Sequence, residues 1–290
     1  MKFDKNTKIL IVGLGLIGGS YAKALSDEGY FVGAIDKKKS SVEYALKNGL
    51  IRVGETSVKK DFVKDFDLIV FALYPHDFIN WIKEYQSSIK SGALITDVTG
   101  VKSFVVENVQ KILRGDLEFV GAHPMAGKEV SGVENADPKI FAGANYIMTP
   151  TKRNTDENVQ AVKDLGRALG FERISSLSPE EHDETVGFLS HLTHCIAVSL
   201  MVSKKSHHLA EYTGDSFRDL TRIAKINDEM WSELFLANKD ELLKQMDLFE
   251  EKFNQLKEDI KNDNREKIRE TLRESTARRK VFDKDAKETK

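Results

Sequence analysis

Short apolar runs alternate with amphipathic stretches of helical period over the first 175 residues of the chain. The runs have the length of buried strands, and most of the stretches between them are long enough for crossover helices. This alternation is typical of a doubly wound α/β domain with a parallel sheet. The predicted strands are residues 8–12, 30–36, 67–73, 93–96, 118–121, 145–149 and, at an edge, 171–175; the predicted helices include 17–28 and 154–169.

The pattern changes to helix after helix from residue 178 onward. Ser178 supplies an N-cap hydroxyl, Pro179 takes the first helical position, and Glu181 follows at the third. Together these residues form a strong helix start. We therefore predict two domains, an α/β domain over residues 1–177 and an all-α domain over residues 178–290.

Two stretches of the helical half differ from an ordinary surface helix. Residues 185–203 carry no formal charge over nearly the length of a membrane span, but they include His191, His194 and several hydroxyl groups. We interpret this stretch as a buried helix of a soluble core. Further on, six apolar residues recur at spacings of three and four: Leu242, Met246, Phe249, Phe253, Leu256 and Ile260. Such a heptad stripe packs against a partner helix, which belongs either to the same chain or to a second subunit.

Composition narrows the class of protein. The 290 residues are 40% hydrophobic and 31% charged, which is the balance of a soluble globular protein. The 44 Lys and Arg residues are matched by 46 Asp and Glu residues, so the net charge of −2 favours neither nucleic acid nor an anionic membrane as a partner. Cys195 is the single cysteine, and the first residues lack the pattern of a secretory signal. We therefore expect a cytoplasmic protein.

A glycine-rich turn follows the first predicted strand. Gly13, Gly15 and Gly18 form the pattern G-x-G-x-x-G, with Leu16 and Ile17 inside it. In a dinucleotide-binding domain the first glycine makes the tight turn, the second admits the pyrophosphate, and the third lets the helix pack on the strand. The N-terminus of the helix then faces the phosphate charge. These five residues are predicted to bind a dinucleotide in a Rossmann-like domain.

The end of the second predicted strand indicates which dinucleotide binds. Asp36 lies 23 residues after Gly13, where a carboxylate accepts hydrogen bonds from the adenosine ribose hydroxyls and repels a 2′-phosphate. This position favours NAD as the cofactor. Lys37, Lys38 and Lys39 follow at once and could offset the repulsion, so NADP is disfavoured rather than excluded.

Three polar clusters carry the residues from which the substrate has to be inferred. Residues 121–129 contain H-P-M-A-G-x-E, residues 182–194 contain H-D and S-H-x-x-H, and residues 217–222 read F-R-D-x-T-R. Together and in this order, the motifs resemble those of the prephenate dehydrogenase family. The resemblance extends from about residue 8 to about residue 231, and it implies a dinucleotide-binding domain followed by a helical dimerisation domain.

The resemblance also implies a reaction and its partners. It predicts NAD-dependent oxidative decarboxylation of prephenate to 4-hydroxyphenylpyruvate in tyrosine biosynthesis. The expected assembly is a homodimer formed through the helical domain. We further expect a monofunctional enzyme, because the sequence has no room for a fused mutase before Lys8 or for a regulatory domain after Trp231.

The chemistry of this reaction indicates a role for His123. Hydride leaves the carbinol carbon while the hydroxyl proton departs, so a neutral imidazole within hydrogen-bond reach is the expected proton acceptor. An unperturbed imidazole titrates at about 6.5, and activity is expected to fall in mildly acidic buffer. Prephenate carries two carboxylates, which an arginine fork suits better than a lysine. The resemblance makes Arg222 this clamp, whereas Arg218 is expected to face solvent.

The resemblance assigns further residues by their motifs. His194 becomes a contact of the substrate or of the nicotinamide ribose, Asp183 an orienting carboxylate, and Glu129 a residue of the substrate site. The family usually has Asp-x-Gly-Ser-x-Lys, whose serine helps to hold the catalytic histidine, but residues 97–102 read D-V-T-G-V-K. Thr99 is the candidate for the missing hydroxyl. The H-x-x-H pair has no further Cys, His or Glu within one turn on its face, so we predict no metal site.

Three alternatives remain. An arogenate dehydrogenase or a dual-specificity cyclohexadienyl dehydrogenase needs the same histidine and clamp and differs only in the side chain of its substrate. A β-hydroxyacid dehydrogenase needs a catalytic lysine in the helical half, and no matching motif surrounds Lys204, Lys205 or Lys225. A catalytically silent NAD-sensing dimer has no reason to keep an imidazole, an arginine and a polar helix face together.

Overall fold

The computed structural model describes residues 1–205 and 208–282 of the chain. The chain divides into two compact units, Met1–Lys239 and Asp240–Lys290. The first unit contains two β-sheets, the helices that cover them and a group of further helices, whereas the described part of the second unit is helical. The predicted domain boundary between residues 177 and 178 stays a prediction.

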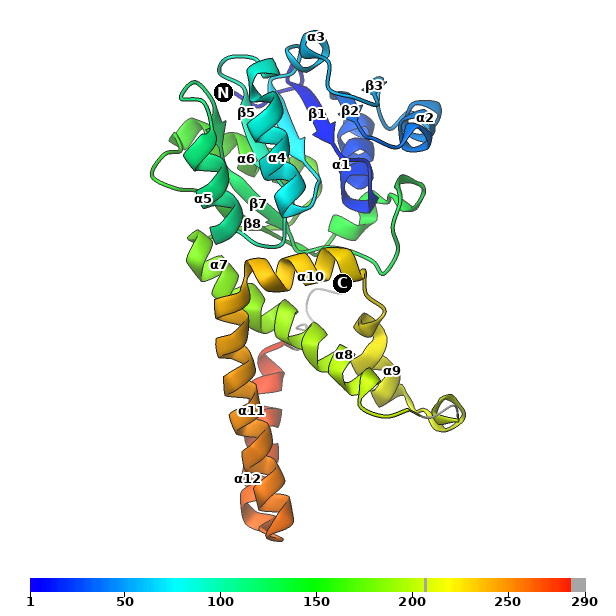
Figure 1. Ribbon diagram of the computed structural model, residues 1–290, viewed down its shortest axis with the longest axis vertical. Helices are drawn as coiled ribbons and strands as arrows, with labels where there is room; N and C mark the ends of the chain where they lie inside the picture. Colours follow the sequence, from blue (N-terminus) through cyan, green and yellow to red (C-terminus); the bar gives the residue numbers. More distant parts are fainter. Residues whose placement is uncertain (206–207, 283–290) are drawn as a thin grey trace, which may run out of the picture. The chain divides into compact units, whose positions relative to one another are not determined.

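Six strands form the larger sheet of the first unit: β1 (Lys8–Val12), β2 (Phe31–Ile35), β3 (Val53–Glu55), β4 (Leu68–Phe71), β5 (Leu94–Asp97) and β6 (Glu118–Phe119). They are parallel, in the order β3-β2-β1-β4-β5-β6, and Figure 1 labels β1, β2, β3 and β5 of this sheet. The connecting helices are α1 (Leu16–Asp27), α2 (Lys39–Lys47), α3 (Lys60–Val63), α4 (Pro75–Tyr85) and α5 (Ser103–Ile112). The direction of the strand order reverses between β1 and β4, and doubly wound sheets bind ligands beyond the carboxyl ends of the strands at such a point. The predicted parallel α/β sheet is confirmed.

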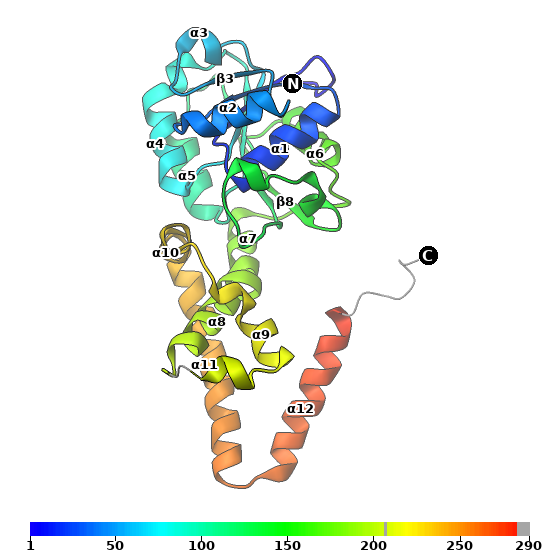
Figure 2. The same ribbon diagram turned by 90° about the vertical axis from the view of Figure 1, so that its right-hand side faces the viewer.

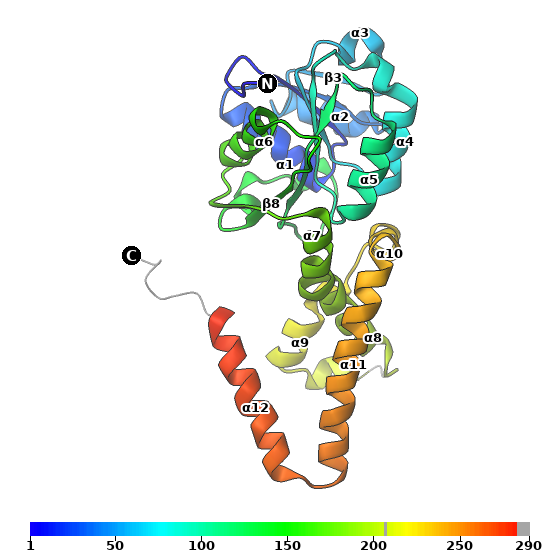
Figure 3. The same ribbon diagram turned by 90° about the vertical axis from the view of Figure 1, so that its left-hand side faces the viewer.

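Both faces of this sheet are covered by apolar cores. Ile9 and Ile11 of β1 belong to one core with residues of α1, α2 and α6 (Asp156–Ala168), whereas Leu10 and Val12 belong to the other with residues of α4 and α5. Figure 3 shows helices on both sides of the strands. Every residue of β4, L-I-V-F, is fully buried. A strand that is buried on both faces forms a continuous apolar run, which is why the sequence pattern located it.

A second, smaller sheet departs from the expected arrangement. Strands β7 (Gly121–Pro124) and β8 (Asn145–Thr149) pair antiparallel, and β8 pairs in parallel with β9 (Arg173–Ser176) at the edge. The predicted strand 118–121 is therefore divided between the two sheets. A Cβ at Gly121 would lie 2.5 Å from Thr149 Oγ1. The glycine thus allows β7 to approach β8 closely where the chain changes sheets.

Helices follow the smaller sheet, as the sequence predicts. They are α7 (Pro179–Val186), a π-helical segment (Gly187–Leu192), α8 (Thr193–Val202), α9 (Asp215–Thr221) and α10 (Asp228–Ala237). The predicted start of α7 is confirmed as a capping box. The Ser178 hydroxyl accepts the N–H of Glu181, and the Glu181 carboxylate accepts the N–H of Ser178.

One helical segment, Pro179–Val202, is long and apolar enough to cross a membrane by length and composition. Only 28% of its most apolar window is buried in the protein. The interpretation of residues 185–203 as a buried core helix is therefore wrong for most of this stretch in the single chain. The sequence shows which residues of this stretch are apolar, but it does not show which of them other parts of the protein cover. Buried and exposed residues therefore occur together in the same segment.

The second unit comprises most of α11 (Lys239–Lys261) and all of α12 (Arg265–Arg279), which diverge from a turn (Figure 2). Asp263 in this turn has a φ of 53°, and the Asn264 side chain caps α12 by accepting the N–H of Lys267. Four residues of the predicted stripe are exposed: Met246 by 38%, Phe249 by 40%, Phe253 by 58% and Ile260 by 58%. Within the second unit, α12 leaves these four side chains exposed, which favours the second-subunit alternative.

Lys102 connects the two sheets of the first unit through a fully buried ion pair with Asp97. Its Nζ donates hydrogen bonds to Asp97 Oδ2 at 2.6 Å, to Ala122 O at 2.6 Å and to Thr99 Oγ1 at 3.0 Å. Asp97 Oδ1 accepts the N–H of Ala122 at 3.0 Å. Neither charged side chain has exposed surface. All three ammonium protons are used, which is the condition under which a buried charge is tolerated.

Replacing Lys102 by methionine is expected to lower the free energy of unfolding by about 3–5 kcal/mol, because the Asp97 carboxylate then stays buried without its counter-charge. Urea denaturation followed by circular dichroism measures this loss. Lys90→Met is the matched control, since Lys90 pairs with Asp67 where the two side chains are 50% and 31% exposed, and such surface pairs contribute at most about 1 kcal/mol. Equal losses in the two variants would contradict the assignment of a structural role to the buried pair.

Candidate active site

The predicted glycine loop lies between β1 and α1, at the carboxyl edge of the larger sheet. Gly13 has a φ of +97°, and a Cβ there would lie 2.4 Å from Ala72 O. A Cβ on Gly18 would lie 1.9 Å from Gly13 O. The first glycine is thus required by the backbone conformation and the third by packing. A Cβ on Gly15 would meet nothing within 4 Å, so the second glycine borders open space.

The N-terminus of α1 adjoins this loop. Leu16 and Ile17 form its first turn, and no side chain caps it, so its backbone N–H groups are available to an anion. Asp36 follows β2 and accepts the N–H of Leu14 at 2.6 Å and that of Lys38 at 2.7 Å. These contacts hold the Asp36 carboxylate beside the glycine loop. The loop, the uncapped helix end and the carboxylate together fit a dinucleotide.

His123 is the third residue of β7 and begins a chain of hydrogen bonds toward α7. Its Nδ1 lies 2.9 Å from His182 Nε2, and His182 Nδ1 lies 2.8 Å from Asp183 Oδ1. The Asp183 carboxylate also accepts the backbone N–H groups of Lys102 and Ser103, each at 2.8 Å. The structure therefore links His123 to Asp183, with His182 between them.

Burial determines the charge of these groups. Removal from water, followed by repulsion from His182 and Lys102, holds the pKa of His123 well below its usual value. Burial also lowers the pKa of His182, against the opposing effect of its hydrogen bond to Asp183. For Asp183, burial raises the pKa, but the hydrogen bond from His182 and the two backbone N–H groups outweigh this effect, and the pKa is lowered. Near neutral pH the hydrogen-bonded series of Asp183, His182 and His123 thus consists of one carboxylate and two neutral imidazoles.

Thr99 and Gly100 occupy the loop after β5. The Thr99 hydroxyl bonds to Asp97, and it lies 3.0 Å from Val101 O and from Lys102 Nζ. Among the described residues these hydrogen-bond partners do not include His123, so Thr99 faces the buried ion pair rather than the imidazole. Gly100 is the nearer residue, since a Cβ there would lie 3.7 Å from His123 Nε2. Because Gly100 follows the carboxyl end of β5, Nε2 of His123 lies at the same edge of the sheet as the glycine loop.

Three of the predicted substrate-site residues lie near one another. The ring of His194 stacks on Trp231 with 3.7 Å between centroids, and its Nδ1 lies 2.8 Å from Ser190 O. Arg222 Nη1 donates to Glu129 Oε1 in an ion pair whose side chains are 64% and 38% exposed. Burial lowers the pKa of His194, and Glu129 and Arg222 are among the charges that act on it. The imidazole, the guanidinium and the carboxylate therefore share one region of the surface.

Arg218 and His191, two further residues considered in the sequence analysis, each have a polar partner in the structure. Arg218 Nη2 lies 2.6 Å from Asp215 on the exposed side of α9, so the expectation that it faces solvent is confirmed. His191 is buried, and its Nδ1 lies 3.3 Å from the side-chain nitrogen of Asn238. Across residues 1–205 and 208–282, no group of three or more His, Cys, Asp or Glu side chains is placed to hold a metal ion.

His182 belongs to the H-D motif of the sequence analysis, which assigned it no role of its own. It is fully buried and lies between the two residues that were assigned roles, His123 and Asp183. The available signal was its position next to Asp183 in the first turns of a strongly capped helix. That signal was insufficient because the contact with His123 joins residues 59 positions apart in the chain.

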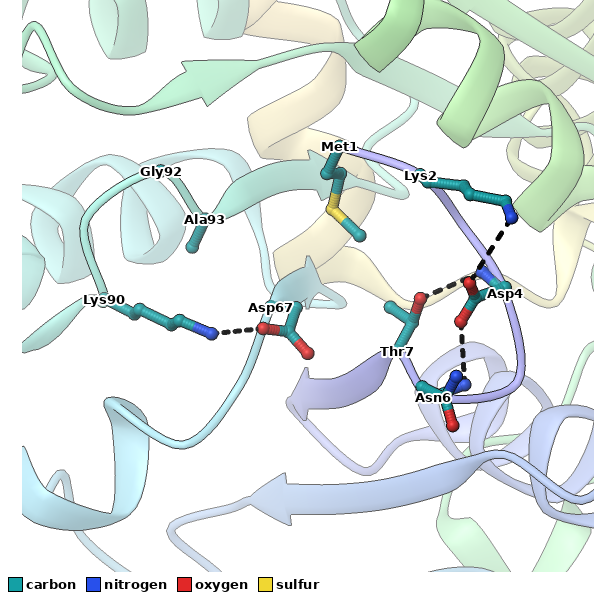
Figure 4. Close-up of a pocket in the computed structure, with 9 residues that line it drawn as sticks. All are labelled: Met1, Lys2, Asp4, Asn6, Thr7, Asp67, Lys90, Gly92 and Ala93. Carbon is teal, nitrogen blue, oxygen red and sulfur yellow. Dashed lines mark hydrogen bonds and ion pairs between the residues drawn. The ribbon is translucent and has the colours of Figure 1, made fainter.

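A hollow of about 250 Å³ lies at the opposite edge of the larger sheet (Figure 4). Its lining includes Thr7, Asp67 and Ala93, which precede β1, β4 and β5. Figure 4 shows polar groups of the lining bonded to one another, among them Lys90 to Asp67. Because doubly wound sheets bind their ligands at the carboxyl edge, we assign no site to this hollow.

Comparison with known proteins places this geometry in a family. The model of the prephenate dehydrogenase nucleotide-binding domain matches residues 21–173, and that of the prephenate dehydrogenase dimerization domain matches residues 178–274. The prephenate dehydrogenase of Bacillus subtilis is 34% identical over 249 residues, which cover 82% of this chain and 66% of that protein. The chain thus spans about two thirds of the length of this relative.

Two further relatives extend over nearly the whole chain. The cyclohexadienyl dehydrogenase of Zymomonas mobilis is 29% identical over 287 residues, covering 96% of each protein. The crystal structure of prephenate dehydrogenase from Aquifex aeolicus, in complex with hydroxyphenyl propionate and NAD+, superposes with a TM-score of 0.87 at 34% identity. This match covers 96% of this chain and 98% of that one. The chain belongs to the prephenate dehydrogenase family.

Proposed function

We propose that the protein catalyses the NAD-dependent oxidative decarboxylation of prephenate to 4-hydroxyphenylpyruvate, in tyrosine biosynthesis. The observation that carries this proposal is the hydrogen-bonded chain from Asp183 through His182 to His123, whose free nitrogen lies at the edge of the sheet that carries the glycine loop. Family membership and the Aquifex aeolicus complex with NAD+ support the same assignment.

The protein's part in this reaction is to orient the substrate and to take one proton. NAD, when bound, accepts the hydride that leaves the carbinol carbon. His123 Nε2 accepts the proton of the substrate hydroxyl, as a neutral imidazole is able to do. Loss of carbon dioxide then yields an aromatic ring, so no acid is required from the protein. His123 is the catalytic base in this proposal.

The glycine loop holds the cofactor. Gly13, Gly15 and Gly18 shape the loop, Leu16 and Ile17 present backbone N–H groups of the first helical turn, and the pyrophosphate lies against them. Asp36 takes the ribose hydroxyls and disfavours a 2′-phosphate. Lys39 pairs with Glu43 at the surface, so one of the three lysines that follow Asp36 is partly neutralised.

The substrate carboxylates are bound by Arg222. Its guanidinium is partly exposed and pairs with the Glu129 carboxylate, which supports a role for Arg222 in binding a carboxylate. His194 and Glu129 contribute the neighbouring polar contacts. Asp183 orients the histidine pair, and Thr99 acts on the site only through the buried ion pair of Asp97 and Lys102.

The alternative substrate is arogenate, taken alone or together with prephenate. A free carboxylate near the pyruvyl or amino side chain of the substrate would favour the amino acid, whereas Glu129 is paired with Arg222. The Zymomonas mobilis relative, named a cyclohexadienyl dehydrogenase, matches 96% of this chain and is consistent with this alternative. The silent NAD-sensing dimer is disfavoured because it requires no histidine chain.

We further propose that the enzyme works as a cytoplasmic homodimer and that neither nucleic acid nor a membrane is a partner. The dimerization-domain model matches residues 178–274, and exposed apolar residues of α8 and α11 lie within this range. The balanced net charge of −2 gives no attraction to polyanions.

Incubation of the purified protein with NAD and prephenate is expected to produce NADH, followed by its absorbance, together with one equivalent of carbon dioxide. A parallel assay with arogenate measures the side-chain preference under the same conditions. Turnover of arogenate alone would assign the alternative, and NADH binding without turnover of either substrate would assign a non-catalytic sensor.

The variant His123→Asn is expected to lose about 10²–10⁴-fold in kcat, because the amide cannot take the hydroxyl proton. The affinity for NAD should stay at the wild-type value, since the glycine loop is unchanged. Steady-state kinetics and fluorescence titration with NADH measure the two quantities. Near-normal turnover would remove His123 from the role of base.

The pH profile of the unmodified protein tests the same assignment. A protonated imidazole cannot accept a proton, so activity is lost as the pH falls through the pKa of His123. Because burial holds this pKa well below its usual value, the acid limb of kcat/KM should lie below the ~6.5 of an unperturbed histidine. The structure therefore predicts that activity is lost at a lower pH than the ordinary histidine pKa assumed in the sequence analysis. A limb at or above the ordinary value would contradict this reasoning.

The variant Arg222→Lys is expected to raise KM for prephenate about 10-fold, which corresponds to roughly 1.4 kcal/mol, because a lysine cannot form the paired hydrogen bonds of the guanidinium. KM for NAD should not change. Arg218→Lys is the matched control, since Arg218 pairs with Asp215 on an exposed helix surface. Similar kinetics for the two variants would exclude Arg222 as the clamp.

A further inference from the structure

The hydrogen bonds of Asp183 determine which nitrogen of His182 carries the proton. An ionised carboxylate can only accept hydrogen bonds. Its Oδ1 lies 2.8 Å from His182 Nδ1, so Nδ1 must be the donor. Since burial keeps His182 neutral, its other nitrogen, Nε2, has a free lone pair and acts as an acceptor.

The same reasoning continues to the next ring. His182 Nε2 lies 2.9 Å from His123 Nδ1. Because His182 Nε2 is an acceptor, His123 Nδ1 must carry a proton and donate it to this contact. A neutral His123 then has no proton on Nε2. The nitrogen that is bare is therefore the one that lies beside Gly100.

We propose that His182 is a positioning residue that fixes His123 in the Nδ1–H tautomer and so keeps Nε2 ready to accept the substrate proton. This inference deepens the proposed function and rests on it for the identity of the reaction. The proposal assigns His182 no contact with substrate or cofactor. It acts through the ring of His123 alone.

The surroundings favour this arrangement on both sides. Asp183 is held by two backbone N–H groups at the start of α5, so its carboxylate cannot turn away from His182. At the other end, the position next to His123 Nε2 carries no side chain, because it is Gly100. A glycine has no side chain that could donate a hydrogen bond to this nitrogen, so position 100 does not compete with a substrate hydroxyl for its lone pair.

Other charged and titratable groups surround the pair without changing its hydrogen bonds. Asp97 approaches from β5, Lys102 from the start of α5, and His191 from the segment after α7. Burial lowers the pKa of His191 to about 4, so it is neutral near pH 7. Lys102 is engaged by Asp97, Thr99 and Ala122. His182 is thus the hydrogen-bond partner of His123 Nδ1 in the described chain.

A free neutral imidazole distributes its proton over both nitrogens. Without His182, part of the His123 population carries the proton on Nε2, and this form cannot accept a second one. The buried Nδ1 is also left without a partner, which costs free energy in the productive tautomer. Loss of His182 should therefore lower the catalytic step and leave the binding of NAD unchanged.

Two substitutions of His182 separate positioning from simple packing. His182→Leu removes the acceptor, and we expect a loss of about 10²-fold in kcat with an unchanged KM for NAD. His182→Gln restores an oxygen acceptor for His123 Nδ1–H but cannot relay a proton, and we expect it to retain most of the turnover. Far-UV circular dichroism and NADH titration confirm that each variant is folded. His208→Gln is the matched control, because His208 is exposed and pairs with Glu211.

Nuclear magnetic resonance of ¹⁵N-histidine-labelled protein observes the tautomer without any turnover. The His123 signals are identified by their absence in His123→Asn. We expect the wild type and His182→Gln to show a protonated Nδ1 and a bare Nε2, and His182→Leu to shift toward the Nε2–H form. If prephenate is not turned over at all, the proposed function fails, but this measurement still tests the tautomer.

Two results would overturn the proposal. One is a ring spectrum of His123 that is the same in His182→Leu as in the wild type. The other is an equal loss of kcat in the leucine and glutamine variants, which would mean that a hydrogen-bond acceptor at position 182 does not sustain kcat. Rescue by glutamine together with the tautomer shift in the leucine variant supports it.

Discussion

The arrangement of the site depends on one buried lysine. The side chain of Lys102 bonds to Asp97 on β5 and to the carbonyl of Ala122 on β7, while its backbone N–H bonds to Asp183 on α7. One residue thus joins the larger sheet, the smaller sheet and the first helix that follows them. Because His123 comes directly after Ala122 and His182 directly before Asp183, the two imidazoles meet at a distance that these bonds determine. A buried charge is unfavourable unless its partners are in place, so the same bonds that satisfy the ammonium also position the rings.

Much of the architecture could be predicted from the sequence, because its signals are local. Strand β4 is a continuous apolar run, and α7 begins with a complete capping box. The division of the predicted strand 118–121 could not be predicted, since it depends on the pairing of Gly121 with Thr149, 28 residues away in the chain. The exposure of Pro179–Val202 was missed for a related reason, because periodicity shows which residues are apolar but not what lies against them.

The site shows the same limit at the level of single residues. The motif residues were found from their spacing, and the structure brings Glu129, His194 and Arg222 into one region. The role considered for Thr99 shows what spacing cannot supply. A hydroxyl at position 99 faces the buried ion pair, while the neighbouring Gly100 is the residue beside His123 Nε2. Successive residues of a loop point in different directions, so a shift of one position moves the hydroxyl away from the imidazole.

The helical part of the chain combines buried polar residues with exposed apolar residues. In Pro179–Val202 the buried polar residues His182, Asp183 and His191 bond to the α/β part of the first unit or to α10 and its cap. These bonds fix the first half of the segment against the rest of the first unit. The remaining apolar side chains, among them Met201 at 47% and Val202 at 74% exposure, and the stripe on α11 lie within the match to the dimerization-domain model. A second copy of the chain is the partner that this match supports, and its contact would remove from water the apolar surface that the single chain leaves uncovered.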